Sequence, residues 1–191
     1  MGGISHLAHW QPLLLASRSP QRRAILRMLG VQFEAVTPGY DEPDLPGTPE
    51  EIAVAHARAK AASVEGERVL GVDTIVVIDE RVLGKPAGEP EAREYLGLLS
   101  GRTHAVHSGL CLRAGEAEHV RHAVTEVTFA RLDEADVEWY LASGEWRERA
   151  GGYAVQGVGA ALVRLISGDY QNVVGLPVPA LIDAMHSVGI R

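Results

Sequence analysis

A disulfide bond within the chain is excluded, because its 191 residues include a single cysteine, Cys111. Long apolar runs are also missing, and a membrane-spanning helix needs about 20 such residues in succession. An excess of basic residues is absent too, since 18 Lys and Arg against 25 Asp and Glu give a net charge of −7. These absences argue against a disulfide scaffold, a membrane protein, and a generic binder of nucleic acid or acidic membranes.

The composition predicts one domain, or two lobes that share a core, over residues 1–191. Hydrophobic residues make up 46 % of the chain, enough for one sizeable core. Cys111 lies in an apolar run, where inert packing is expected, and a lone thiol fits a cytoplasmic protein. Residues 1–9 lack the basic and apolar regions of a secretion signal, and residues 1–10 are expected to form a flexible extension.

Several motifs of known chemistry are also missing. There is no His-Glu-x-x-His and no Gly-x-Ser-x-Gly, which argues against a zinc protease and a serine hydrolase. Leu162 stands where a dinucleotide-binding fingerprint would need its third glycine. Pro86 stands where a phosphate-binding loop ending in Gly84-Lys85 would need Ser or Thr. Any phosphate site is therefore of neither of these two types.

The hydrophobic pattern predicts an α/β fold with a mixed sheet, because helical and strand segments alternate and two long strands are adjacent in sequence. Helices are expected at residues 20–29, 49–64, 90–99, 133–143 and 179–188. Strands are expected at residues 13–16, 31–37, 68–78, 82–83, 103–113, 119–131 and 160–166.

Asp73 is the residue that most strongly suggests a function. Its strand, residues 68–78, is apolar, so a carboxylate there costs desolvation free energy unless it has a partner. Thr74 beside it could bond a ligand or fill a strand position, and Lys85 follows in a Gly-Lys-Pro turn where a cation can hold a phosphate. On these residues alone, a functional and a structural role for Asp73 are equally supported.

The segment from Ser17 to Arg23 predicts a helix start with Ser19 as its N-cap and Pro20 at its first position. Such an end presents unpaired N–H groups to an anion, and Ser17 and Arg22 add donors for phosphate. Spacing alone favours an ordinary capped helix.

Three other segments are ambiguous by themselves. Lys60, late in the helix of residues 49–64, is expected to be a solvated surface lysine, and the Asp41-Glu42 pair an exposed loop pair. The glycine-rich residues 151–159 are expected to form a shaped loop that can approach a ligand closely.

In this order, over residues 13–185, these segments resemble the Maf family of nucleoside triphosphate pyrophosphatases, once named for septum formation. The segments that carry the resemblance are Leu15-Ala16-Ser17-Arg18-Ser19-Pro20-Gln21-Arg22-Arg23, Asp41-Glu42, Lys60-Ala61, Asp73-Thr74, Gly84-Lys85-Pro86, Leu99-Ser100-Gly101-Arg102-Thr103-His104, Ala150-Gly151-Gly152-Tyr153-Ala154-Val155-Gln156-Gly157 and Val173-Val174-Gly175-Leu176-Pro177.

The resemblance implies a strongly bent mixed sheet flanked by helices, related to inosine triphosphatases, with two lobes around a nucleotide cleft. It implies hydrolysis of a nucleoside triphosphate to the monophosphate and pyrophosphate, with a divalent metal, Mg²⁺ or alternatively Mn²⁺. Asp73 is then the general base and Glu42 helps it hold the metal. Ser17, Arg22, Lys60 and Lys85 would hold the triphosphate. The nucleotide is the expected partner, nucleic acid and membrane are not, and a homodimer is plausible.

Thr74 and Gln156 resemble the branch of the family that hydrolyses dTTP and UTP. The family usually has arginine where Gln21 stands and lysine where Arg149 stands, so the base preference stays open. Two alternatives remain: a nucleotide-binding regulator of septum formation and division arrest with little hydrolysis, and a purine-directed enzyme of the inosine triphosphatase type.

Overall fold

The computed structural model describes residues 13–188. The predicted flexible extension at residues 1–10 lies outside this range. The helices are α1 (Pro20–Met28), α2 (Pro49–Ala62), α3 (Glu89–Leu99), α4 (Glu134–Ser143), α5 (Tyr170–Val174) and α6 (Val178–Ser187). The strands are β1 (Leu13–Ala16), β2 (Phe33–Val36), β3 (Arg68–Ile78), β4 (Arg81–Leu83), β5 (Thr103–Ala114), β6 (Ala117–Phe129) and β7 (Val163–Ser167). Within residues 13–188, no helix is both long enough and apolar enough to span a membrane.

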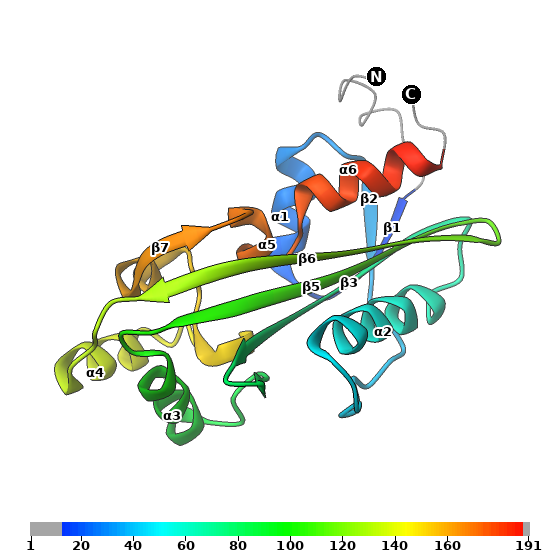
Figure 1. Ribbon diagram of the computed structural model, residues 1–191. Coiled ribbons are helices and arrows are strands. Elements are labelled where there is room, and N and C mark those ends of the chain that lie inside the picture. The colour runs from blue at the N-terminus through cyan, green and yellow to red at the C-terminus, as the bar shows by residue number, and fades with distance from the viewer. Residues whose placement is uncertain (1–12, 189–191) are drawn as a thin grey trace. The chain divides into compact units, whose positions relative to one another are not determined.

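The seven strands form one mixed sheet in the order β2-β1-β3-β5-β6-β7, with β4 paired to β3 (Figure 1). β1 pairs in parallel with both β2 and β3. The β3–β4 and β6–β7 pairs are antiparallel. The predicted α/β fold with a mixed sheet flanked by helices is therefore confirmed, whereas the bend of the sheet and the cleft stay predictions.

The chain divides into two compact units, each made of several segments. Unit 1 comprises residues 1–73, 108–123 and 175–191, and unit 2 comprises residues 74–107 and 124–174. Three long strands, β3, β5 and β6, run from one unit into the other. The expectation of a single domain over the whole chain stays a prediction, and each unit is described by itself.

In unit 1, helices α1 and α2 lie on opposite faces of the sheet (Figure 1). α1 connects β1 to its parallel neighbour β2 on one side, and α2 returns from β2 across β1 to β3. Such crossovers are right-handed, so two crossovers that run in opposite directions place their helices on opposite faces. α6 lies on the same side as α1 (Figure 1).

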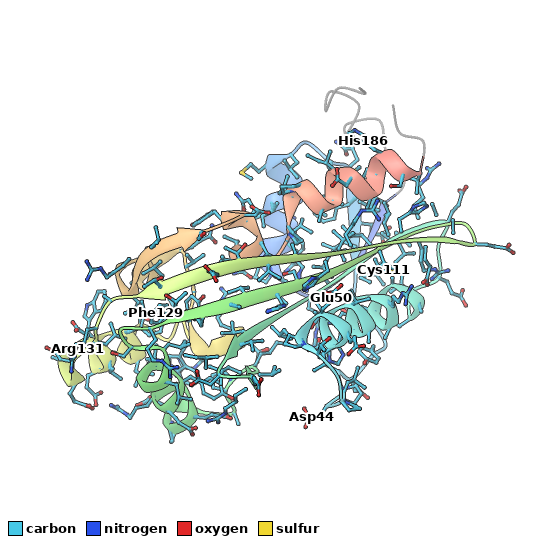
Figure 2. All side chains as sticks on the ribbon, in the orientation of Figure 1. Asp44, Glu50, Cys111, Phe129, Arg131 and His186 are labelled. Carbon is cyan, nitrogen blue, oxygen red and sulfur yellow. The ribbon has the colours of Figure 1, made fainter. Side chains whose placement is uncertain are left out.

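Helix α2 approaches the sheet unusually closely because glycines lie beneath it. A Cβ atom on Gly71 of β3 would be 2.1 Å from the backbone oxygen of Ala57, and one on Gly109 of β5 would be 2.2 Å from that of Ala53. Ala57 also packs with Cys111, which is fully buried on β5 (Figure 2). The expectation of inert packing for Cys111 is confirmed.

The core of unit 2 contains an aromatic cluster. Phe129 on β6 (Figure 2) makes edge-to-face contacts with Tyr153 and His104, at ring-centroid distances of 4.8 and 5.1 Å. The Tyr153 hydroxyl also forms a 2.8 Å hydrogen bond with His104 Nε2. Such an arrangement favours the quadrupoles of the rings and satisfies one polar atom of each buried partner.

The predicted starts of α1 and α2 are confirmed by their caps. Ser19 caps α1 through the N–H of Arg22, and Thr48 forms a reciprocal capping box with Glu51 at the start of α2. Two details of the prediction are wrong. The strand expected at residues 160–166 begins only at Val163, after a 3₁₀ helix over Gly157–Leu162, and the short helix α5 was not expected.

Candidate active site

The chain leaves β1 at Ser17, where a compact set of polar groups begins. Ser17 Oγ accepts a hydrogen bond from the backbone N–H of Ser19 (3.1 Å) and another from Arg22 Nη1 (3.2 Å). Arg22 Nε donates to the carbonyl of Gly175 at 2.8 Å. Gln21, half-buried on α1, accepts from the hydroxyl of Ser19 at 3.2 Å. Because Ser17 uses its oxygen as an acceptor, its own proton can be donated to a ligand.

Asp73 occupies β3 immediately beyond the end of its neighbour β1. The register pairs Ala16, the last residue of β1, with Gly71. Asp73 and Gly71 are two apart, so both point to the face that α2 covers. The carboxylate, in a residue that is 5 % exposed, therefore lies where the carboxyl end of a parallel strand opens space in the sheet. Ligand sites in open α/β sheets occur at this edge.

Lys60 forms ion pairs with two carboxylates. Its Nζ lies 2.5 Å from Asp73 Oδ1 and 2.7 Å from Glu42 Oε1, and its side chain is only 5 % exposed. The expectation that Lys60 is a solvated surface lysine is therefore wrong. The reason is the close approach of α2 to β3 at Gly71, which brings the last turn of the helix directly over Asp73.

Glu42 reaches Lys60 from the loop between β2 and α2. Its side chain is 35 % exposed, and its backbone has φ of +47°. A left-handed conformation costs a residue with a side chain about 1–2 kcal/mol, so the surrounding structure must hold it. The expectation of an exposed loop pair is confirmed, since both residues are exposed, and Glu42 in addition turns its carboxylate toward the buried Lys60.

The pKa values of Arg22 and Tyr40 both reflect the negative charges of Asp73 and Glu42. Burial lowers the pKa of Arg22, while the negative charges of Asp73 and Glu42 act in the opposite direction. Burial, followed by the charges of Asp73 and Glu42, raises the pKa of the Tyr40 hydroxyl. Two cations and two carboxylates therefore gather in unit 1, and Tyr40 stays protonated beside them.

Two carboxylates on one ammonium group also fit the chemistry of a divalent metal. Mg²⁺ is commonly held by one or two carboxylates together with oxygens of a phosphate ligand. Glu42 and Asp73 provide such hard oxygen donors. Within residues 13–188, no group of three or more His, Cys, Asp or Glu forms a metal cage. The arrangement suits an ion that arrives with a phosphate ligand.

Four of the predicted site residues belong to unit 2. Thr74 is half-buried in β3, Lys85 is exposed in the turn after β4, and Gln156 is exposed at the start of a 3₁₀ helix. Arg149 precedes the short 3₁₀ helix Ala150–Gly152. The Gly151 N–H donates to the carbonyl of Gly84 at 3.0 Å, which brings the segments of Lys85 and Arg149 side by side.

Sequence reasoning missed a second contact between the loop and α2. The Tyr40 hydroxyl forms a 2.9 Å hydrogen bond with Nδ1 of His56, which is buried at 7 % exposure. A signal was present: His56 lies one helical turn before Lys60, and Tyr40 lies two residues before Glu42. The first spacing places His56 on the face of α2 that carries Lys60, and the second places Tyr40 on the same side of the loop as Glu42.

Comparison with known proteins shows the fold and the family of the chain. A HAM1 protein from Coxiella burnetii has a similar fold, with a TM-score of 0.55 and 19 % identity over 94 % of this chain and 98 % of that one. A protein of Symbiobacterium thermophilum named dTTP/UTP pyrophosphatase is 45 % identical, covering 94 % of this chain and 95 % of its own length. A protein of the same name from Thermus thermophilus is 43 % identical, covering 94 % of this chain and 96 % of its own length. The family model of the Maf-like proteins matches residues 12–188, and the chain belongs to that family.

Proposed function

We propose that this protein is a nucleoside triphosphate pyrophosphatase that hydrolyses dTTP and UTP to the monophosphate and pyrophosphate. The observation that carries the proposal is the pair of carboxylates, Glu42 and Asp73, held on the buried ammonium of Lys60. The proposal is supported by membership of the family. It is also supported by relatives that are named dTTP/UTP pyrophosphatase and that match this chain over nearly their whole length.

In the proposed reaction a water molecule attacks the α-phosphorus. The new bond joins the water oxygen to that phosphorus, and the bond from the α-phosphorus to the oxygen bridging to the β-phosphate breaks. One proton of the water passes to Asp73 and the pyrophosphate leaves. Lys60 contacts Oδ1 of Asp73, and we propose that Oδ2 of the same carboxylate accepts the proton.

Cations and donors of the chain would bind the triphosphate. We propose that Ser17 donates its free proton to a phosphate oxygen, and that Arg22 and Lys60 neutralise the charge that develops as the bond breaks. A bound Mg²⁺, held by Glu42 and Asp73, would add Lewis-acid stabilisation of the phosphates. Mn²⁺ is the alternative ion.

The residues of unit 2 take the remaining proposed roles. Lys85 would contact the phosphates, and Thr74, Gln156 and Arg149, with Gln21 of unit 1, would contact the nucleotide. An amide such as that of Gln156 can both donate to and accept from the edge of a pyrimidine. A homodimer, the absence of nucleic-acid binding and a cytoplasmic location stay predictions.

Pyrophosphate release tests the proposal. Purified protein is incubated with dTTP, UTP, CTP, dATP, GTP and ITP, each with Mg²⁺, with Mn²⁺ and with EDTA. We expect release from dTTP and UTP that requires the metal, and in ¹⁸O water we expect the label in the monophosphate. Nucleotide binding without release would support the regulator instead, and preferred release from ITP would support the purine-directed enzyme.

A further inference from the structure

The loop that carries Glu42 has few means of holding itself in place through its backbone. Residues 38–47 contain three prolines, at 38, 43 and 46, and each lacks a backbone N–H donor. The loop also carries the left-handed backbone of Glu42, which is costly unless neighbouring contacts hold it. Side-chain contacts to a rigid element are therefore needed to fix Glu42 at Lys60.

Two such contacts join this loop to α2. Tyr40 meets His56 through the 2.9 Å hydrogen bond, and Glu42 meets Lys60 at 2.7 Å. The Tyr40 and His56 rings also touch, with centroids 5.7 Å apart and planes tilted by 54°. Figure 2 marks the rest of the loop by Asp44 and the first turn of α2 by Glu50.

The spacing of the two contacts matches on both sides. His56 and Lys60 are one helical turn apart, which is a rise of about 6 Å. Tyr40 and Glu42 are two residues apart, and two residues of extended chain span at most about 7 Å. The two contacts therefore lie next to each other between the loop and the helix. The Tyr40–His56 contact places Glu42 where it can reach Lys60.

We propose that Tyr40 and His56 are positioning residues, whose hydrogen bond holds the Glu42 carboxylate against Lys60 and beside Asp73. This inference rests on the proposed function only in taking Glu42 as a ligand of the metal. Neither Tyr40 nor His56 is assigned contact with the substrate. Their effect is to keep one ligand of a two-carboxylate site at the distance that metal binding needs.

The consequence is a change in metal dependence rather than a loss of the chemical step. Loss of a single neutral hydrogen bond is expected to raise the Mg²⁺ concentration for half-maximal rate about five-fold, with kcat at saturating metal nearly unchanged. Mn²⁺ binding to the free protein, measured by electron paramagnetic resonance, should weaken by the same factor.

The experiment is a double-mutant cycle with Tyr40→Phe, His56→Leu and the double variant. If the pair acts as one unit, each single variant shows the five-fold change and the double variant shows no more than either single one. Tyr95→Phe is the matched control, because it also removes one tyrosine hydroxyl, which donates to Glu91 at 2.8 Å, yet should leave metal dependence unchanged. Independent effects that multiply in the double variant would overturn the proposal.

Hydrogen exchange separates this proposal from the proposed function. Tyr40→Phe should speed exchange of the amides in residues 38–47, while the amides of α2 keep their protection. This result supports the positioning role even if the wild-type protein releases no pyrophosphate. Unchanged exchange together with unchanged Mn²⁺ binding overturns it, whatever the activity. If Tyr40→Phe fails to fold, His56→Leu gives the same two measurements.

Discussion

Replacing Gly71 by alanine should damage the site without touching any of its polar groups. The added Cβ would lie 2.1 Å from the backbone oxygen of Ala57, and 2.7 Å from the backbone N and 2.9 Å from the Cβ of Ala61. Real Cβ atoms need about 3.4 Å to such neighbours, so α2 must move by roughly 1 Å. Helix backbone cannot rotate away as a flexible side chain would.

This movement has two measurable effects. Overpacking of a close contact costs about 1–3 kcal/mol, which a urea titration reports as a lower free energy of unfolding. The shift also draws Lys60 away from Asp73, now 2.5 Å apart, and a misplacement of about 1 Å costs on the order of 100-fold in rate. We therefore expect a folded protein with dTTP hydrolysis reduced about 100-fold.

Gly97→Ala provides the matched control. Gly97 lies in α3, and a Cβ there meets no atom within 4 Å. The same substitution should raise the free energy of unfolding by about 0.5–1 kcal/mol, since alanine is the better helix former, and should leave the rate unchanged. If Gly71→Ala matches wild type in both stability and rate, the close approach of α2 does not position Lys60 and the reasoning fails.

Two further substitutions test the buried charges. Lys60→Met removes the ammonium group that pairs with the buried Asp73 carboxylate, so the free energy of unfolding should fall by about 3 kcal/mol. Lys60→Met combined with Asp73→Asn should recover part of this loss, and a double variant less stable than the single one would contradict the reasoning. Burial lowers the pKa of His104 to about 4, so the folded state resists protonation that the unfolded state accepts near pH 6.5. The contribution of His104 to stability should thus be full above pH 6.5 and fall toward pH 4. Urea titrations should show that the free energy of unfolding of the wild type, relative to His104→Asn, decreases by about 2 kcal/mol between pH 7 and pH 5. A difference that does not change with pH would refute a neutral buried imidazole.

The helices and most strands could be predicted from sequence because their signals are local. Ser19 with Pro20 marks the start of α1, and the Thr48–Glu51 box marks the start of α2. The run of apolar residues predicts a strand at Leu162, but a short apolar run does not distinguish strand from helix, and the structure has a 3₁₀ helix over Gly157–Leu162.

The polar site could be predicted only in part. A carboxylate on an apolar strand indicated a partner for Asp73, and the structure provides one in Lys60. Nothing local revealed that Lys60 is that partner, because its burial depends on how closely α2 packs on Gly71. The Tyr40–His56 contact was missed for the same reason, since the path of a loop relative to a helix is decided by tertiary packing.

The most direct test of the central claim is the rate of dTTP hydrolysis by Asp73→Asn, measured together with its affinity for dTTP. The substitution keeps the shape of the side chain and removes its charge and its basicity. Loss of a positioned general base lowers rates by about 10²–10⁴-fold, so the account predicts a fall in kcat of that size with dTTP still bound. A variant that binds dTTP and turns it over at a near-normal rate would contradict it.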